Sequence, residues 1–545
     1  MRRVAERRLG AQPFDLLVVG AGVNGAGVAR DAALRGLRVL LVDQEDCGAG
    51  TTSWSTRLVH GGLRYLQHGE VGLVRESLRE RERLLRLAPH LVAPLPFLIP
   101  VYRGRGRGRL TIRAGMLAYD ALALDGSLPR HRMLDHAGAL AHEPGLEREG
   151  LRGAALYHDA QVAFPERLAV ETALAAHDAG AVVLTHTRMQ RLLCEEGRVV
   201  GAELRDALGG EVAVARAAVT ANVTGPWVDV TLGSTAGLPE RRLVGGTKGS
   251  HLVVAPFPGA PRHALYVEAG DGRPFFVVPW NGLLLVGTTD TRYAGDLDDV
   301  EADEREIAYL LDETNRVLPA AGLRRDDVLY TYAGVRPLPE HQQGDEGAIT
   351  RRHVVHDHAP ELDGLISVVG GKLTTFRELA RQVVDLAVRK LGRPARRPRT
   401  ADLPLPGGAG ADPSGFARDF LAAHAHALPE GTADRLLRLY GTRADDVLAV
   451  AAEEPALAEV LDPSSGALRA EVVHAVRSEL AVTLDDVLMR RTMLGLGASA
   501  GVGPDRAAAE VAVAHLGWSC ERAAAEVERH RERVRRSHAR SAPAA

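Results

Sequence analysis

The segment at residues 51–69, TTSWSTRLVHGGLRYLQHG, gathers groups that can hold an anion and move a proton. Five serine and threonine hydroxyls, two arginines, two histidines and a glycine pair stand within nineteen residues. An arginine can form paired hydrogen bonds to a phosphate or a carboxylate, and a histidine can accept a proton near neutral pH. The segment is too polar for a core strand and too apolar at its leucines and valine for a free loop. We therefore expect it to line a binding site that neighbouring elements build.

The residues just before this segment predict the first of those elements, a nucleotide-binding βαβ unit. An apolar strand is expected at 15–19, followed by GAGVNG at 20–25, a helix over 26–35 and a second strand over 38–42 that ends in Asp43. In a GxGxxG turn the first glycine permits the sharp bend, the second admits a pyrophosphate, and the third packs the helix on the strand. The helix N-terminus faces the phosphates, and the terminal acid can accept hydrogen bonds from a ribose diol. A tight turn without a ligand is the alternative, and the motif alone does not choose between FAD and NAD.

Later segments of the chain favour FAD. A strand at 365–369 runs into a glycine pair and a helix over 372–391, whose N-terminus can stabilise negative charge on a reduced isoalloxazine. A strand over 217–224 ends in TGPW, a turn like those by which flavoprotein folds approach the adenine half of FAD. Residues 182–188 are expected to form the strand before it, and 198–216 a hairpin that crosses over. A chain that returns three times to one nucleotide domain is typical of an FAD-binding, Rossmann-like fold of the glutathione-reductase type, in the α/β (α+β) class.

The region at about 246–350 is predicted to be an antiparallel sheet that covers the flavin and carries the substrate site. It contains PFFVVPWNGLLLVGTTD, two apolar runs joined by Asn-Gly, the pair most typical of a two-residue hairpin turn. Charged residues stand in apolar surroundings here, namely Lys248, His251, Arg336 and Arg351. A desolvated arginine suits a phosphate or a carboxylate, and a structural ion pair is the alternative for each. Two such arginines in one flavin-covering domain favour an anionic substrate.

Taken together, these segments resemble the FAD-dependent glycerol-3-phosphate dehydrogenases of the quinone-linked, aerobic type. The matching pieces, in chain order, are GAGVNGAG, TTSWSTRLVHGGLRYL, NVTGPW, TKGSH, GTTD, YAGVRPL, AITR and GGKLTT, and they span about residues 14–395. The long matches SWSTRLVHGGLRYL and GGKLTTFR are specific, whereas GxGxxG is not. The C-terminal region is similar more loosely, chiefly around DDVLMRRT at 485–492.

The resemblance implies a reaction. It implies that sn-glycerol 3-phosphate is oxidised at C2 to dihydroxyacetone phosphate in glycerol catabolism, with hydride passing to flavin N5 and electrons passing on to a quinone. The nearest alternative is an oxidase on the same fold, in which dioxygen reoxidises the flavin and hydrogen peroxide is released. A non-catalytic FAD-binding or RNA-associated protein is a further alternative, and the substrate cations and His60 argue against it.

The same motifs supply the expected site residues. His60 and His251 are the candidate bases, with no order between them, and Arg336 is expected to bind the developing alkoxide or the phosphate. The expected substrate-binding residues are Arg64, Tyr65, His251, Arg336, Arg351 and Lys372. The expected FAD-binding residues are Gly20, Gly22, Asn24, Gly25, Asp43, Thr51, Thr52, Ser53, Arg188, Thr224, Gly225, Gly371, Lys372, Leu373 and Thr374. No metal site is expected, and His68 is expected at the surface or in packing.

The composition of the chain limits which cellular compartment and which partners are expected. The formal net charge of −3 argues against a general nucleic-acid coat, and three cysteines without a CxxC pair favour a reducing compartment. No run reaches the roughly 18–20 apolar residues of a membrane span. We expect a cytoplasmic protein whose membrane contact is peripheral, through the basic and then apolar stretch at 102–124, with a solvated basic loop as the alternative. No nucleic-acid partner is expected, and a homodimer is left open.

The expected elements divide the chain into seven stretches. The FAD-binding domain is expected in three parts, at 14–95, 156–245 and 356–395. A peripheral or substrate-domain insertion with the basic amphipathic segment occupies 96–155, the antiparallel-sheet substrate domain occupies 246–355, a linker occupies 396–415, and a C-terminal helical domain occupies 416–535.

Overall fold

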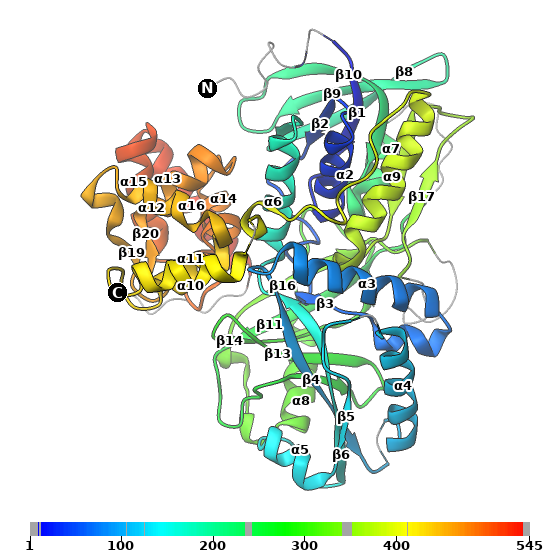
Figure 1. Cartoon of the computed structure of the whole chain (residues 1–545), viewed down its shortest axis with the longest axis vertical. Helices are drawn as coiled ribbons and strands as arrows, with labels where there is room; N and C mark the ends of the chain where they lie inside the picture. The colour runs from blue at the N-terminus through cyan, green and yellow to red at the C-terminus, as the bar shows by residue number, and fades with distance from the viewer. Residues whose placement is uncertain are drawn as a thin grey trace.

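The computed structural model describes residue 9 and residues 12–104, 106–124, 126–234, 242–340, 351–410 and 412–537. Arg105 of the basic stretch and residues 348–350 of the AITR motif therefore lie outside the described residues. Figure 1 shows a nucleotide-binding sheet with its helices at the top, a second sheet below it, and a cluster of C-terminal helices beside both.

The nucleotide-binding sheet is built from segments that lie far apart in the sequence. Its strand order is β17-β18-β10-β1-β2-β7, and all neighbours are parallel except β17 and β18. The strands are β1 (Phe14–Val19), β2 (Val39–Val42), β7 (Val182–Leu184), β10 (Val212–Asn222), β17 (Val354–Asp357) and β18 (Leu365–Val369). The prediction that the chain returns repeatedly to one nucleotide domain is confirmed.

The two faces of this sheet are covered differently, because successive side chains of a strand point to opposite faces. Leu16 and Val18 pack with α2 (Val23–Leu34), α6 (Pro165–Asp178) and α9 (Phe376–Leu391). Leu17 and Val19 pack with the meander formed by β8 (Thr187–Glu195), β9 (Arg198–Asp206) and the first half of β10. Burial on both faces explains why β2, and β1 apart from Asp15 near its start, are apolar.

The second sheet is largely antiparallel and combines strands from the first and middle thirds of the chain. The middle third supplies β11 (Thr247–Val254), β12 (Ala264–Glu268), β13 (Pro274–Trp280), β14 (Leu283–Gly287), β15 (Thr291–Arg292) and β16 (Val328–Arg336). The first third supplies β3 (Leu58–Val59), β4 (Val92–Tyr102), β5 (Arg132–Leu134) and β6 (Leu151–Val162). Asn281 and Gly282 both have positive φ, of 51° and 74°, so the predicted hairpin between β13 and β14 is confirmed.

Helices cover this sheet and support the segment at 51–69. The helices α5 (His136–His142) and α8 (Glu304–Val317) pack on one face. The helices α3 (Val71–Leu87) and α4 (Arg109–Leu122) lie beside the short 3₁₀ helix η1 (Leu63–His68), which ends the segment. His68 is exposed, as expected.

The C-terminal domain is helical, as predicted. Its helices are α10 (Pro413–His424), α11 (Thr432–Tyr440), α12 (Ala444–Ala451), α13 (Arg469–Ser478), α14 (Leu484–Asp486), α15 (Pro504–Leu516) and α16 (Cys520–Arg536), and α14 continues into a π-helical turn, η10 (Val487–Arg491). The expected linker is anchored to two helices: Leu405 N–H donates to Leu87 O at the end of α3 at 2.9 Å, and Arg30 of α2 donates to the carbonyls of Leu403 and Pro404. Among the described residues, no helix is long and apolar enough to cross a membrane.

Candidate active site

A cavity of about 1090 Å³ lies where the two sheets and the C-terminal domain meet. Eighteen of the predicted site residues line it. They are Gly20, Gly22, Asn24, Asp43, Thr51, Thr52, His60, Tyr65, Arg188, Thr224, Gly225, His251, Arg336, Arg351, Gly371, Lys372, Leu373 and Thr374. Gly25, Ser53 and Arg64 are the predicted residues that the structure does not place in the cavity wall.

The glycine turn between β1 and α2 leaves room for a pyrophosphate. Gly20 has a φ of +102°, and a Cβ built on it would lie 2.6 Å from the carbonyl oxygen of Val223 at the end of β10. A Cβ on Gly25 would lie 1.8 Å from the Gly20 carbonyl oxygen, so Gly25 packs the helix on the turn and does not face the cavity. Any side chain at these two positions would force the turn open. The first turn of α2 therefore stays close to the strand ends, and Gly22, Val23 and Asn24 at the N-terminus of the helix line the cavity.

Asp43, at the end of β2, is held over this turn. One carboxylate oxygen accepts from Ala21 N–H at 2.6 Å and the other accepts from Glu45 N–H at 2.9 Å. Burial raises the pKa of Asp43 to about 6, even though both backbone donors oppose the shift. The glycine turn at 20–25 and Asp43 together form what we call the nucleotide cradle. The Asp43 carboxylate is fixed in direction at its rim, where the diol of a nucleotide ribose would reach it.

These features fit FAD. The glycines of the cradle leave room for phosphates to approach the backbone, and Asp43 stands where the ribose would lie. The cavity then continues past Thr224 and Gly225 to the second sheet. At the far end, Thr374 at the start of the α9 turn exchanges hydrogen bonds with the backbone of His60. Thr374 and Thr375 lie in a 3₁₀ turn, η6 (Leu373–Thr375), that precedes α9, so the helix proper begins at Phe376 and not at the predicted Lys372.

The segment at 51–69 runs along the cavity. Some of its side chains hold neighbouring elements together, and others line the cavity. Thr51 Oγ1 donates to Val335 O at 2.8 Å, and Thr52 Oγ1 accepts from Val23 N–H at 3.1 Å, so the segment ties the second sheet to α2. Ser53 is buried and donates to Gly48 O at 2.7 Å, away from the cavity. Arg57 is fully buried in a bidentate pair with Glu166, at 2.8 Å for each bond, and serves the structure.

A group of cations stands in the cavity wall on the second-sheet side. Arg336, the last residue of β16, donates to Asp290 at 3.1 Å, to Thr288 Oγ1 at 2.9 Å and to Thr289 O at 3.2 Å. Arg351 donates to the other oxygen of Asp290 at 3.0 Å, and its Nη1 is buried without a hydrogen-bond partner among the described residues. Asp290 therefore aligns two guanidinium groups and neutralises only one of them.

Lys372 adds a third cation. Its Nζ donates to Ser77 Oγ at 2.8 Å and lies 4.6 Å from the centre of the Tyr65 ring. Burial lowers the pKa of Lys372 from 10.5 to about 7, because the nearest carboxylates only partly offset the lost hydration. Among the described residues, Arg336 and Arg351 against Asp290 leave a surplus of about one positive charge, and Lys372 adds up to one more when it is protonated, which suits a phosphate anion.

The two candidate bases both line the cavity and are both uncharged near neutral pH. Burial, and then Lys372 and Arg81, lower the pKa of His60 to about 3. Burial, and then Arg336 and Arg57, hold the pKa of His251 well below its usual value. His251 Nε2 lies 3.0 Å from Thr56 Oγ1, its ring stacks on Tyr332 at 4.7 Å, and its buried Nδ1 has no partner among the described residues.

Sequence reasoning missed residues that the structure brings to the site. Asp290 aligns both arginines, and its signal was present in the GTTD motif, which matched without being assigned a role. Met489 and Arg533 of the C-terminal domain also line the cavity, whereas no catalytic or binding cluster was predicted there. Lys248, singled out for its apolar surroundings, bonds Glu306 at 2.8 Å outside the cavity wall, which supports the ion-pair alternative for that residue.

Comparison with known proteins agrees with this architecture. Residues 15–377 match the family described as FAD dependent oxidoreductase, and residues 398–523 match the C-terminal domain of alpha-glycerophosphate oxidase. The chain therefore belongs to the FAD-dependent oxidoreductases, and FAD is its cofactor.

Individual relatives identify a smaller family within the FAD-dependent oxidoreductases. The chain is 45% identical over 539 residues to a glycerol-3-phosphate dehydrogenase of Synechocystis sp., covering 95% of this chain and 96% of that one. It is 39% identical over 484 residues to a D-erythritol 1-phosphate dehydrogenase of Brucella abortus, covering 88% and 94%. The structure of a glycerol-3-phosphate dehydrogenase from Bacillus halodurans complexed with FAD superimposes with a TM-score of 0.79 at 28% identity, covering 98% and 97%. Within the oxidoreductases, the chain thus belongs to the glycerol-3-phosphate dehydrogenase family.

Proposed function

We propose that this protein oxidises the secondary hydroxyl of sn-glycerol 3-phosphate and yields dihydroxyacetone phosphate. The observation that carries the proposal is the set of three cations in the wall of the FAD cavity, Arg336 and Arg351 paired with Asp290, and Lys372 beside Tyr65. A surplus of positive charge on half-buried side chains beside a flavin site suits a small substrate with a phosphate, and the names of the relatives agree with that class.

Different residues of the cavity wall bind the phosphate, bind the oxygen at C2 and accept the hydroxyl proton. Arg351, whose Nη1 has no hydrogen-bond partner among the described residues, binds the phosphate together with Lys372, and Arg336 binds the phosphate or the oxygen at C2. Anchoring a phosphate that does not react holds C2 in one position, an effect worth several kcal/mol in favourable cases. His60 or His251 accepts the hydroxyl proton, since both are neutral before substrate binds. Bound FAD supplies the hydride acceptor.

Binding of the phosphate also prepares the base. A dianion beside Lys372 and Arg336 offsets the positive field that helps to depress the pKa values of His60 and His251. Each imidazole is thereby a stronger base in the complex than in the free protein. Tyr65, which lies under Lys372 and lines the cavity, keeps the ammonium directed at the substrate.

The test compares substrates and one variant. With a soluble dye as electron acceptor, kcat/KM is measured for sn-glycerol 3-phosphate, glycerol and D-erythritol 1-phosphate in the native protein and in Arg336→Leu. We expect turnover of sn-glycerol 3-phosphate, none of glycerol, and a fall of about 10²-fold or more in the variant. Wild-type efficiency in Arg336→Leu would overturn the assignment of the site. Preference for D-erythritol 1-phosphate would support the phosphate site but would show that sn-glycerol 3-phosphate is not the preferred substrate.

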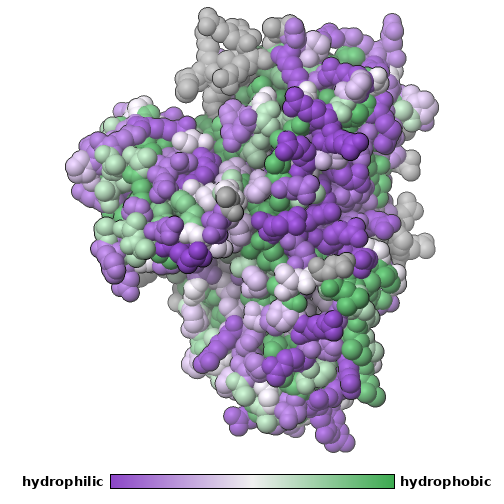
Figure 2. Space-filling model, in the orientation of Figure 1, coloured by the Kyte–Doolittle hydropathy of each residue, from purple (hydrophilic) through white to green (hydrophobic). Residues whose placement is uncertain are grey.

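We further propose that a quinone at a membrane surface accepts the electrons. Leu110, Leu117 and Leu124 are 81%, 54% and 64% exposed. The first two stand two turns apart on α4, with the exposed Arg113 between them and the exposed Arg109 next to Leu110. Figure 2 shows apolar atoms gathered at the right-hand edge where Figure 1 places α4. An exposed apolar stripe beside arginines suits peripheral contact with anionic lipid. Dioxygen is the alternative acceptor, and stoichiometric hydrogen peroxide in air-saturated buffer would favour it.

A further inference from the structure

A buried ion network joins the C-terminal domain to the loop that follows β2. Asp46 lies three residues after Asp43 and is fully buried. It accepts from Arg490 Nε at 2.7 Å and from both terminal nitrogens of Arg491, one of them at 2.9 Å. Both arginines belong to the π-helical turn η10 of the C-terminal domain. The carboxylate of Asp46 therefore obtains its charge partners from another domain.

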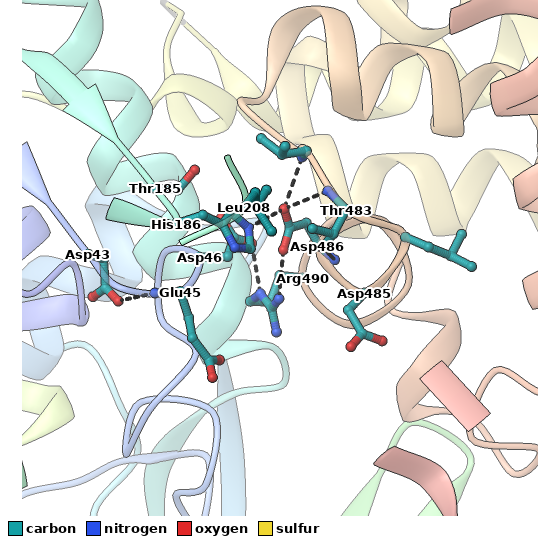
Figure 3. A network of polar contacts seen from close by, with 12 residues as sticks. Asp43, Glu45, Asp46, Thr185, His186, Leu208, Thr483, Asp485, Asp486 and Arg490 are labelled. Atoms are coloured by element: carbon teal, nitrogen blue, oxygen red, sulfur yellow. Dashed lines mark hydrogen bonds and ion pairs between the residues drawn. The ribbon is translucent and has the colours of Figure 1, made fainter. Parts of the chain in front are cut away.

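A second arm of the network reaches the same loop from the other side. Arg490 Nη2 donates to Asp486 at 2.9 Å, and the other oxygen of Asp486 lies 2.9 Å from His186 Nε2. Burial alone would raise the pKa of Asp486, but His186 and the two arginines hold it well below its usual value. In Figure 3, Asp46 and His186 stand between Asp43 and Glu45 on one side and Asp486 and Arg490 on the other.

The backbone at His186 connects its contact with Asp486 to the nucleotide cradle. Its N–H donates to Glu45 O at 2.7 Å, and the next N–H, that of Thr187, donates to Asp43 O at 2.6 Å. His186 has a φ of +50°, a strained conformation that lets these two N–H groups point at the loop while the imidazole points at the C-terminal domain. Asp43 in turn accepts from Ala21 in the glycine turn. One chain of contacts therefore runs from Asp486 to the cradle.

The geometry points to a positioning role for the C-terminal turn 482–491: through His186 and Asp46 it sets the position of Asp43 and so the affinity for the adenosine end of FAD. The turn acts from behind the loop, so these are positioning residues. If the domain undocks, Asp46 loses both arginines and Asp486 loses His186, so the loop after β2 loses the contacts that hold its backbone. The inference concerns FAD binding and holds whichever substrate is oxidised.

The experiment measures FAD affinity and thermal stability in matched variants. The test variant is His186→Asn, because asparagine tolerates positive φ but its amide is too short to reach Asp486. The control is His530→Asn, which removes a buried imidazole bound at 2.7 Å to the neighbouring Asp485, inside the C-terminal domain. Apo-protein is titrated with FAD by flavin fluorescence, and Tm is recorded with and without FAD.

We expect the Kd for FAD to rise about tenfold or more in His186→Asn and to stay within about twofold in His530→Asn, although Tm falls in both. An unchanged Kd in His186→Asn with a Tm loss like that of the control would reduce the network to a structural contact and overturn the inference. If His186→Asn does not fold, Arg490→Lys decides by the same readout, since a lysine keeps the charge but cannot bridge Asp46 and Asp486.

Discussion

Lys372 should impose a pH limit on substrate capture. Burial holds its pKa at about 7 in the free protein, whereas the proposed phosphate contact requires the charged ammonium. With that pKa, about one tenth of the molecules carry the charge at pH 8 and about one hundredth at pH 9. Because kcat/KM reports the free enzyme, it should fall about tenfold for each pH unit above 7.

The histidines cannot produce this fall. The pKa of His60 is about 3 and that of His251 is well below its usual value, so both stay neutral across pH 6–9. The substrate phosphate, with a second pKa of roughly 6, is largely a dianion from pH 7 upwards, where the fall is expected. A descending limb near pH 7 is therefore specific to Lys372.

The assay follows dye reduction from pH 6 to 9 with sn-glycerol 3-phosphate below its KM. Lys372→Met should lower kcat/KM at pH 6.5 and abolish the descending limb. The matched control is Lys248→Met, which removes a lysine bound to Glu306 outside the cavity wall and should keep the limb. A flat native profile between pH 7 and 9, or a limb that survives in Lys372→Met, would refute the assignment of Lys372 to the phosphate.

Three further outcomes are expected. Gly20→Ala should abolish FAD retention, since a Cβ there would lie 2.6 Å from a carbonyl oxygen, and the ratio of flavin to protein absorbance measures this directly. Replacing Leu110 and Leu117 together by glutamine should weaken co-sedimentation with anionic vesicles and leave dye-linked activity unchanged; equal sedimentation would remove α4 from the membrane contact. Burial would raise the pKa of Glu479, but Arg167 overrides it and lowers the pKa to about 2. Stability from this pair should be complete above about pH 4.5 and fall as the pH drops toward 2, and an acid titration of Tm that stays flat would contradict it.

The nucleotide cradle could be predicted because its signals are local. Gly20, Gly25 and Asp43 are fixed by a strand, a turn and a strand within thirty residues, and each residue type meets a steric or hydrogen-bonding need of that turn. The hairpin at Asn281 and Gly282 was predictable for the same reason. Residue types in unusual surroundings also identified Arg336, although the same argument selected Lys248, which the structure places in an ion pair outside the cavity wall.

Contacts between distant segments could not be predicted in this way. Asp46 and Arg490 are separated by 444 positions, and neither residue is unusual for its local sequence. The same holds for Ser53, whose hydroxyl was expected at the cofactor but donates to the carbonyl of Gly48. Composition indicates what a segment can do, whereas the packing of domains decides which of its groups face the cavity.

An anaerobic visible spectrum of the FAD-loaded protein, recorded before and after addition of sn-glycerol 3-phosphate, tests the proposed oxidation in a single experiment. We predict that the oxidised flavin band bleaches with this substrate and not with glycerol, because Arg336 and Arg351, paired with Asp290, must hold a phosphate. A flavin band that persists in the presence of sn-glycerol 3-phosphate would contradict the proposed function.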